Sequence, residues 1–392
     1  MSPGDEFDPG DDGGERGGPP GAGGTSRRAW LAGAGLAAIT GAGAGFAGNE
    51  WARPDPAPAV PRLAAGSVPG GAGGPWHYVE PGGSIQDTID GGAKAVQLGD
   101  GTYDIRQPIV PTAGCVIRGI GQRTRLVAGA EMDAMIAVGN GRPIDAVQVT
   151  DLLLACGGKA AVGIDLNVVG TDGNYEGEPD SVCRLDDLWV FDAAQDGIVY
   201  RGTDTQACTS SRIRVRRAGR YGYRVEAPDN VWFGCEGTSR GKDGAGFYVG
   251  TAIPGSNGIG AGNVHFHGCK AWYCAGVGWH VNGSRSSFTG CESQDTGGHG
   301  WLIERPRTTL VGCIADTAAM AAVGGRPDSA DGFHVLPGEE LTLVGCMAFD
   351  RGPGGIAKQQ RYGFNVPTSL VDAGLLVGHT GWDNVKGLVN RR

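Results

Sequence analysis

The chain has little of what several common classes of protein need. Only 19% of its 392 residues are charged and the formal net charge is −9, so the sequence excludes the broad basic surface with which proteins bind nucleic acids. No cysteine precedes Cys115, so we expect no lipid anchor on an N-terminal cysteine. The most apolar N-terminal run is rich in glycine and alanine, which makes it marginal for crossing a bilayer.

The N-terminal region has the composition of an exported leader. Residues 1–24 are largely glycine, proline and acidic residues, which cannot bury a core. Arg27 and Arg28, followed by Trp30, Leu31 and a mildly apolar run, resemble a twin-arginine export signal. The sequence predicts a signal region at 1–47, a Pro/Gly linker at 48–75 and one domain at 76–392. We expect a secreted protein whose partner during export is the twin-arginine translocase, with no stable membrane anchor.

Glycine, by contrast, is abundant, with 74 residues, and it punctuates an internal repeat. One recurring segment has the form glycine, aromatic residue, any residue, then Val or Ile. Its copies are GYRV (222–225), GFYV (246–249), GWHV (278–281), GWLI (300–303), GFHV (332–335) and GFNV (363–366). A second segment ends in Gly–Cys, at Cys235, Cys269, Cys291, Cys313 and Cys346. Its shortest interval, 22 residues, is the length of one solenoid coil.

The alternation within each segment predicts strands, because successive side chains on a strand point to opposite faces. Stacking the coils places the aromatic residues of the first segment in one inward column and its Val or Ile residues in a second. The first column holds Tyr223, Phe247, Trp279, Trp301, Phe333 and Phe364, and the second holds Val225, Val249, Val281, Ile303, Val335 and Val366. The predicted fold class is all-β, a right-handed parallel β-helix.

Residues 84–129 resemble the first coils of the pectin-lyase-like β-helix superfamily. In that family a short amphipathic helix covers the open end of the solenoid, and here Ile85 and Ile89 stand four residues apart. The strands that follow match the family pattern at Gly101, Tyr103, Ile117, Gly119, Gly121, Thr124 and Leu126. The resemblance implies an N-terminal capping helix. It leaves the activity open, because the superfamily includes pectate lyases, polygalacturonases, epimerases, fructotransferases and phage tailspikes.

The ten cysteines do not have the pattern of a disulfide framework. Five of them follow glycine at one equivalent corner, and parallel side-chain vectors on successive coils are poor geometry for a disulfide. We expect buried thiols that pack as small apolar groups. Cys269 and Cys274, which share one coil, are the candidate pair for a local bridge.

The outward positions of the second segment supply the candidate site. If Val264 and Phe266 point inward, their neighbours must point outward, and aligning the coils on this rule predicts an exterior ladder of Trp189, Arg214, Trp232, His265 and Ser287. It is flanked by Asp187, Arg212, Asn230 and Asn263 on one side and by Phe191, Arg216, Gly234, His267 and Thr289 on the other. Indole rings stack on sugars and guanidinium groups bind carboxylates. The sequence therefore predicts a groove for an acidic polysaccharide along the solenoid axis.

These residue types favour proton abstraction from a uronate over glycoside hydrolysis. Hydrolysis needs two carboxyl groups, and the ladder offers only Asp187. Elimination needs cations that neutralise the uronate carboxylate and a base that removes the adjacent proton. We predict catalytic roles for His265, His267, Arg214, Arg216 and Asp187, and substrate binding by Trp189, Trp232, Arg212, Asn230 and Asn263. The predicted function is a secreted polysaccharide lyase or uronate-modifying enzyme.

Two functions of other classes stay open. A glycoside hydrolase or fructosyl-transferring enzyme would need carboxylates delivered by loops, such as Asp295, Asp328 or Asp331. A non-catalytic glycan-binding or envelope-associated solenoid would keep the Trp and Arg face without a titratable group in a perturbed environment.

Four insertions interrupt the repeat, at 167–182, 251–262, 318–330 and 350–361. Long insertions in a solenoid usually border its binding face, so we expect these to line the groove.

Two motifs remain, one acidic and one containing histidine. The first insertion carries Asp172, Asn174 and Glu176 in the spacing that begins a calcium loop, and Cys183 at position twelve excludes an EF-hand. Calcium is therefore the one cofactor that the sequence suggests. His299, in the string GHG, is interpreted as a corner residue of the repeat. His280 and His334 are expected to point outward from the neighbouring strand.

Overall fold

The computed structural model describes residues 76–170, 182–255, 258–336, 340–352 and 357–392. The predicted signal region and linker lie outside the described residues, as does the predicted calcium loop with Asp172, Asn174 and Glu176. In the described part of the chain, no helix is long and apolar enough to cross a membrane.

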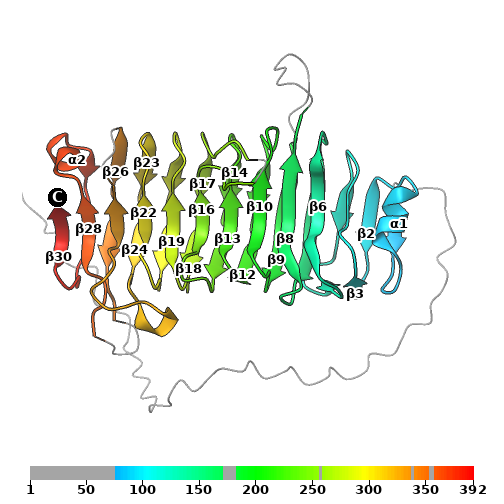
Figure 1. Ribbon diagram of the computed structural model, residues 1–392, viewed down its shortest axis with the longest axis horizontal. Coiled ribbons are helices and arrows are strands. Elements are labelled where there is room, and N and C mark those ends of the chain that lie inside the picture. The colour runs from blue at the N-terminus through cyan, green and yellow to red at the C-terminus, as the bar shows by residue number, and fades with distance from the viewer. Residues whose placement is uncertain (1–75, 171–181, 256–257, 337–339, 353–356) are drawn as a thin grey trace, which may run out of the picture. The chain divides into compact units, whose positions relative to one another are not determined.

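Residues from Trp76 onward form a right-handed parallel β-helix, which confirms the predicted fold class. Each coil contributes one short strand to each of three walls, and each strand pairs in parallel with its counterpart in the next coil. Figure 1 shows the coils stacked side by side from helix α1 (Ile85–Asp90) at one end to strand β30 (Gly387–Arg391) at the other.

Wall 1 precedes the Gly–Cys corner of each coil. Its strands are β1 (Trp76–Val79), β2 (Ala95–Leu98), β4 (Val116–Arg118), β11 (Thr209–Ser211), β14 (Val231–Phe233), β17 (His265–His267), β20 (Ser287–Thr289), β23 (Thr308–Val311), β26 (Leu341–Val344) and β29 (Leu376–Val377). Wall 2 follows that corner. Its strands are β3 (Gly101–Ile105), β5 (Thr124–Ala128), β12 (Arg214–Ala218), β15 (Glu236–Ser239), β18 (Lys270–Trp272), β21 (Glu292–Gln294), β24 (Ile314–Asp316) and β27 (Met347–Phe349). Strands β7 (Gln148–Ala155) and β9 (Arg184–Phe191) run through both walls.

Wall 3 is a separate ten-stranded sheet. Its strands are β6 (Met132–Arg142), β8 (Ala160–Val168), β10 (Asp196–Arg201), β13 (Tyr221–Val225), β16 (Ala245–Val249), β19 (Val277–Val281), β22 (Trp301–Ile303), β25 (Phe333–Val335), β28 (Tyr362–Val366) and β30. The described residues also include two short helices, η1 (Ala321–Val323) and α2 (Thr368–Asp372).

The predicted capping helix is present as α1 at the N-terminal end. Ser84 begins it, because its Oγ accepts a hydrogen bond from the backbone N–H of Asp87 at 3.0 Å. Ile85 and Ile89 both point into the solenoid and are buried, as the four-residue spacing predicts. The helix thus covers the first coil, whose strand edges would otherwise be open.

The inward columns of wall 3 are as predicted. All six aromatic residues of the first column are fully buried, and neighbouring rings stack with centroids 4.0 Å apart for Phe247 and Trp279 and 4.8 Å for Trp279 and Trp301. The indole N–H of Trp279 donates to the backbone oxygen of Glu292 at 2.9 Å, which satisfies its one polar group. The core is therefore a continuous stack along the solenoid axis.

The cysteines are buried thiols, and the predicted bridge between Cys269 and Cys274 is not formed. The two residues lie at different corners of one coil, because Cys269 precedes β18 and Cys274 follows it. Cys269 instead contacts the preceding coil, because its Sγ accepts a hydrogen bond from the backbone N–H of Cys235 at 3.4 Å. Burial raises the pKa of the Cys269 thiol well above its ordinary value, which keeps it protonated.

Candidate functional site

The groove predicted from the sequence does not form, because the register of the coils is set at the Gly–Cys corner. Gly234 and Gly268 occupy equivalent positions there, with φ of +57° and +59°, a left-handed conformation that favours glycine. Trp232 stands two residues before Gly234, as Phe266 stands two residues before Gly268, so the two side chains pair. Trp232 therefore points inward and is fully buried. Asn230 is also buried. The prediction that these two residues line a solvent-facing groove is therefore wrong.

The other members of the predicted ladder lie on two different walls. Arg214 pairs with Trp189 and Glu236 on wall 2. His265 pairs with Ser287 on wall 1, on the other side of the corner. The predicted single row of guanidinium and imidazole groups is therefore not present.

The two wall 2 arginines of the predicted site share one carboxylate within the protein. Arg214 and Arg216 both bind Glu236, with N···O distances of 3.2 Å and 2.6 Å. Burial alone would raise the pKa of Glu236, but the hydrogen bond from Arg216 outweighs it and lowers that pKa, so the carboxylate stays charged. Arg216 also lies over the rings of Trp272 and Trp189, at 4.7 Å and 5.7 Å from their centroids. Both guanidinium groups are therefore held on wall 2 by Glu236 and the indole rings, and not beside the wall 1 histidines with which the prediction grouped them.

The acidic corner residue of the predicted site is likewise paired. Arg212 donates to Asp186 at 2.7 Å, and its Nε lies 3.8 Å from Asp187. Both Asp187 and Arg212 have positive φ, because they occupy the corner position that glycine fills in later coils.

The two wall 1 histidines point outward as predicted but have no acidic partner in the hydrogen bonds of the described residues. His265 shares a 2.6 Å hydrogen bond with the Ser287 hydroxyl, and the ring of His267 stacks on Phe233 at 5.1 Å. Asn263 is exposed beside them. No network here fixes a tautomer for catalysis, so wall 1 is not the best candidate.

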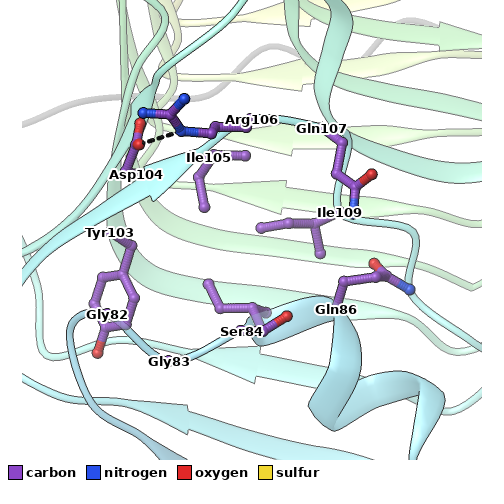
Figure 2. Close-up of a pocket in the computed structure, with 11 residues that line it drawn as sticks. Gly82, Gly83, Ser84, Gln86, Tyr103, Asp104, Ile105, Arg106, Gln107 and Ile109 are labelled. Atoms are coloured by element: carbon purple, nitrogen blue, oxygen red, sulfur yellow. Dashed lines mark hydrogen bonds and ion pairs between the residues drawn. The ribbon is translucent and has the colours of Figure 1, made fainter.

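A cavity of about 300 Å³ lies between helix α1 and strand β3, and Figure 2 shows the residues around it. Its charged side chains, Asp104 and Arg106, pair with each other at 2.7 Å and are exposed. The remaining lining residues are neutral, including Ser84, Gln86 and Tyr103. This cavity is part of the packing between the capping helix α1 and the first coils, and its lining brings together no group suited to acid–base or nucleophilic catalysis.

All four insertions border wall 3, and the first two also lead into wall 1, at β9 and β17. Those at 167–182 and 251–262 follow the wall 3 strands β8 and β16, and those at 318–330 and 350–361 precede β25 and β28. The last two are joined to each other, because the side chain of Gln360 accepts from the backbone N–H of Ala318 at 2.9 Å. Because insertions lie at both edges of wall 3, this wall is the best candidate for a binding face.

The outer face of wall 3 carries a row of mostly polar and aromatic side chains, of which Arg224, Tyr248 and Asn365 are buried beneath their neighbours. Successive coils place in one row Arg224, Tyr248, His280, Leu302, His334, Asn365 and Asn390. The outward orientation predicted for His280 and His334 is confirmed by these pairings and by their partial exposure. Neighbouring members stand one strand spacing apart, about 4.8 Å.

The most highly organised cluster of wall 3 is centred on Asp331, at the end of the insertion 318–330. Its carboxylate is fully buried and receives the two-pronged guanidinium of Arg361, with both N···O distances 2.7 Å. Asn365 donates to it at 2.8 Å and the backbone N–H of Tyr362 at 3.3 Å. Burial alone would raise the pKa of Asp331, but Arg361 first, then His334 and Asn365, hold it well below its usual value.

Two histidines flank this carboxylate on adjacent coils, and their rings stack with centroids 4.3 Å apart. His334 Nδ1 lies 2.8 Å from Asp331 Oδ2, so it must carry the hydrogen and donate. His299 Nδ1 accepts the backbone N–H of Asp331 at 3.0 Å, so its hydrogen must be on Nε2. The interpretation of His299 as a plain corner residue is therefore incomplete, since it joins a buried polar network.

The hydrogen bonds thus place the Nδ1 hydrogen on His334 and the Nε2 hydrogen on His299. Burial, and then the adjacent His334, lower the pKa of His299 from 6.5 to about 4, which keeps it neutral at physiological pH. Among the described residues neither Nε2 atom has a hydrogen-bond partner, and neither is among the buried unpartnered atoms, so both reach solvent. The site presents a hydrogen-bond donor on His299 beside a lone pair on His334.

The same three residues could be considered as metal ligands, because one ligand atom of each lies within 4.8 Å of the others. Both carboxylate oxygens of Asp331, however, already accept from Arg361. A cation bound there would stand beside a guanidinium group, which like-charge repulsion disfavours. The arrangement therefore suits proton transfer better than metal binding.

The chain contains an internal comparison for this cluster. Asp196 is equally buried, receives the guanidinium fork of Arg220 at 2.9 Å and 2.5 Å, and accepts the backbone N–H of Tyr221 at 3.3 Å. The sequences correspond, with DGIV (196–199) and RYGYR (220–224) matching DGFH (331–334) and RYGFN (361–365). The aspartate and arginine are therefore a structural clamp used twice.

The difference between the two copies lies in the flanking positions. Val162, which pairs with Asp196, occupies the place of His299, and Val199 occupies the place of His334. Both valines are buried. The clamp is complete without imidazoles, so architecture alone does not explain the two histidines of the second copy.

No family model matches the chain, and no curated protein matches it significantly. Its fold, however, has solved relatives. The A-module of the Azotobacter vinelandii mannuronan C-5 epimerase AlgE4 matches with a TM-score of 0.55 at 13% identity, over 78% of this chain and 92% of that one. The enzymatically active domain of tailspike protein 2 from bacteriophage CBA120 gives a TM-score of 0.50 at 15% identity, over 68% of this chain and 39% of that one. At these identities the similarity shows the fold alone.

A second polar group lies nearer the middle of wall 3. Glu304 Oε2 is 2.9 Å from His280 Nε2, and the ring of Tyr248 meets His280 edge-on at 5.2 Å. Burial raises the pKa of Tyr248, whose hydroxyl donates to the backbone oxygen of Thr251 in the covering insertion. This group adds hydrogen-bonding capacity along the same row.

The sequence did contain a signal for this site. The insertions before β25 and β28 end at Asp331 and Arg361, each directly before a wall 3 strand. A second signal is the order DG on one coil and RYG on the next, which occurs at 196–197 with 220–222 and again at 331–332 with 361–363. The contact between His299 and His334 could not be read from the sequence, because 35 positions separate them and the length of the intervening coil is irregular.

Proposed function

We propose that the protein is a secreted enzyme that binds an acidic polysaccharide along wall 3 and modifies it by proton transfer at a uronate residue. The observation that carries this proposal is the pair of stacked imidazoles, His299 and His334, held in opposite tautomers by Asp331. A row of polar and aromatic groups on consecutive coils supports binding of a polymer along the axis. The fold similarity to an enzyme named for its action on mannuronan supports the substrate class.

The chemistry follows from the two free ring nitrogens. His334 Nε2 takes the proton from the carbon next to the uronate carboxylate, and the electron pair of that bond moves into the carboxylate as an enolate. His299 donates its Nε2–H to the developing negative charge, as a neutral imidazole of lowered pKa can do. In elimination the enolate expels the glycosidic oxygen at the next carbon, and that oxygen takes the proton held by His334, which gives an unsaturated product. In epimerisation the carbon regains a proton from water on its opposite face, and His334 releases its proton to solvent.

A hydrolase is less well supported by the described residues. The loop carboxylates that it would need are occupied, because Asp331 is bound by Arg361 and the buried Asp295 receives Arg351 at 2.6 Å. Two solvent-facing carboxyl groups across a glycosidic bond are therefore not found at this cluster.

The test replaces each histidine by the residue that the first copy of the clamp carries. In His334→Val we expect turnover of polyuronates to fall roughly 100- to 10,000-fold, because the general base is lost. His299→Val should lower it as well, while the melting temperature of both variants stays near that of the wild type. Ultraviolet absorbance of the unsaturated product measures elimination, and solvent deuterium uptake into the polymer measures epimerisation.

The matched control is His265→Val on wall 1, which should keep full activity. Turnover at the wild-type rate in the His334→Val variant would disprove the assignment of His334 as the base. Binding of polyuronates by the wild type with neither product would instead indicate the non-catalytic glycan-binding protein.

A further inference from the structure

A second concave site lies at the corner between walls 2 and 3, several coils before the histidine pair. It is a cavity of about 380 Å³ lined by Gly157, Gly158, Asp192, Arg217, Gly219 and Arg240, together with two alanines. Its residues come from four successive coils, from the end of wall 2 and from the turns that follow it. The glycines and alanines of the lining have no polar side-chain groups, so the charged side chains are the groups that could bind a ligand in this cavity.

The charges in this cavity do not balance. Two guanidinium groups share a single carboxylate, because Arg217 and Arg240 both bind Asp192. These three are the titratable residues among those that line the cavity. The cavity therefore carries a surplus of one positive charge on a chain whose net charge is −9. Such a local surplus attracts anions over short range.

The two arginines use their donors differently. Arg217 directs its Nε and Nη2 at both oxygens of Asp192, and its guanidinium lies 5.5 Å from the centroid of Phe191. Arg240 makes one contact to Asp192, through Nη2. More than half of the Arg240 side chain is exposed, so the remaining N–H donors of this guanidinium face the solvent.

We propose that this cavity binds a single anionic group, a carboxylate or sulfate, with Arg240 as its principal ligand. The oxygens of either group match the fork of a guanidinium. The anion is a substituent of the glycan that runs along wall 3, and this part of the inference rests on the proposed function. Arg220, in the turn that leads from this cavity into wall 3, belongs to the first structural clamp, so the cavity and the wall are connected through one short segment.

The experiment uses inorganic sulfate, a sulfated oligosaccharide and an oligouronate, each titrated at constant ionic strength by calorimetry. Arg240→Gln should weaken binding at least tenfold. Asp192→Asn should strengthen it, because the anion then takes the place of the lost carboxylate and receives both guanidiniums. Asparagine also tolerates the positive φ of 55° at this position. A stronger response to the sulfated or to the uronate ligand identifies the source of the anion.

The control is Arg123→Gln, an exposed arginine paired with Asp100 at 3.0 Å, which should leave binding unchanged. Equal losses in Arg123→Gln and Arg240→Gln would show non-specific attraction and overturn the proposal, as would unchanged binding in Arg240→Gln. His334→Val should still bind sulfate. This outcome separates failure of the anion site from failure of the proposed catalytic function.

Discussion

Asp331 and Asp196 show how neighbouring side chains decide the role of a residue. Both are buried, and both receive the fork of an arginine and a backbone N–H. Only Asp331 has imidazoles beside it, and its hydrogen bonds give the two rings different tautomers. The same clamp therefore also orients two imidazole rings in the second copy.

The protonation behaviour of His299 predicts acid sensitivity. Folding lowers its pKa from 6.5 to about 4, so its contribution to stability is fully present above pH 6.5 and is lost as the pH falls toward 4. The loss is roughly 3 kcal/mol, and the lowered pKa of Asp331 adds a further loss below its ordinary value of 3.8. Urea unfolding between pH 7 and 4 measures it. His299→Val should flatten this part of the profile, and an unchanged slope would contradict the assignment.

At the scale of the element, the corners set which face each strand presents. A glycine or another residue of positive φ holds the corner between walls 1 and 2, and one residue of displacement from it reverses every side chain of a strand. Trp232 illustrates this effect, because the sequence prediction matched it with the outward His265, whereas the corner register pairs it with the inward Phe266.

The aromatic column of wall 3 predicts a large loss of stability on truncation. Trp279 is fully buried between Phe247 and Trp301 and donates its indole N–H to a backbone oxygen. Trp279→Ala should cost about 3 to 5 kcal/mol, because it leaves a cavity and an unpaired carbonyl. Denaturant unfolding measures the change.

The matched control for this truncation is Leu302→Ala, on the outer face of the adjacent coil. Its cost should be well below that of Trp279→Ala, because the side chain is only partly buried. Equal losses from the two variants would show that the stack is not the main source of stability.

At the scale of the whole solenoid, one wall gathers both the insertions and the ordered polar groups. Walls 1 and 2 carry histidines and arginines as well, but these pair locally with a serine hydroxyl, an aromatic ring or Glu236. Two insertions follow wall 3 strands and two precede them, so insertions lie at both edges of this wall.

This geometry predicts that activity depends on the length of the substrate. An oligouronate long enough to reach from His334 past His280 to Arg224 contacts more of the row than a dimer does. The ratio kcat/KM should rise by at least tenfold between a dimer and a hexamer and then level off. A length series of defined oligomers measures it, with sulfate binding at Arg240 followed in parallel. Equal kcat/KM at all lengths would place the substrate across the wall rather than along it.

The sequence by itself determined the solenoid, its inward columns and its capping helix, because these depend on alternation, on the coil repeat and on a four-residue spacing within one short segment. Only the tertiary structure decided which outward residues meet. The coils differ in length, so the partner of a given residue on the next coil depends on where each corner falls. This register removed Trp232 from the predicted groove and separated His265 from Arg214. It also joined His299 to His334 through Asp331, a contact that no local pattern specifies.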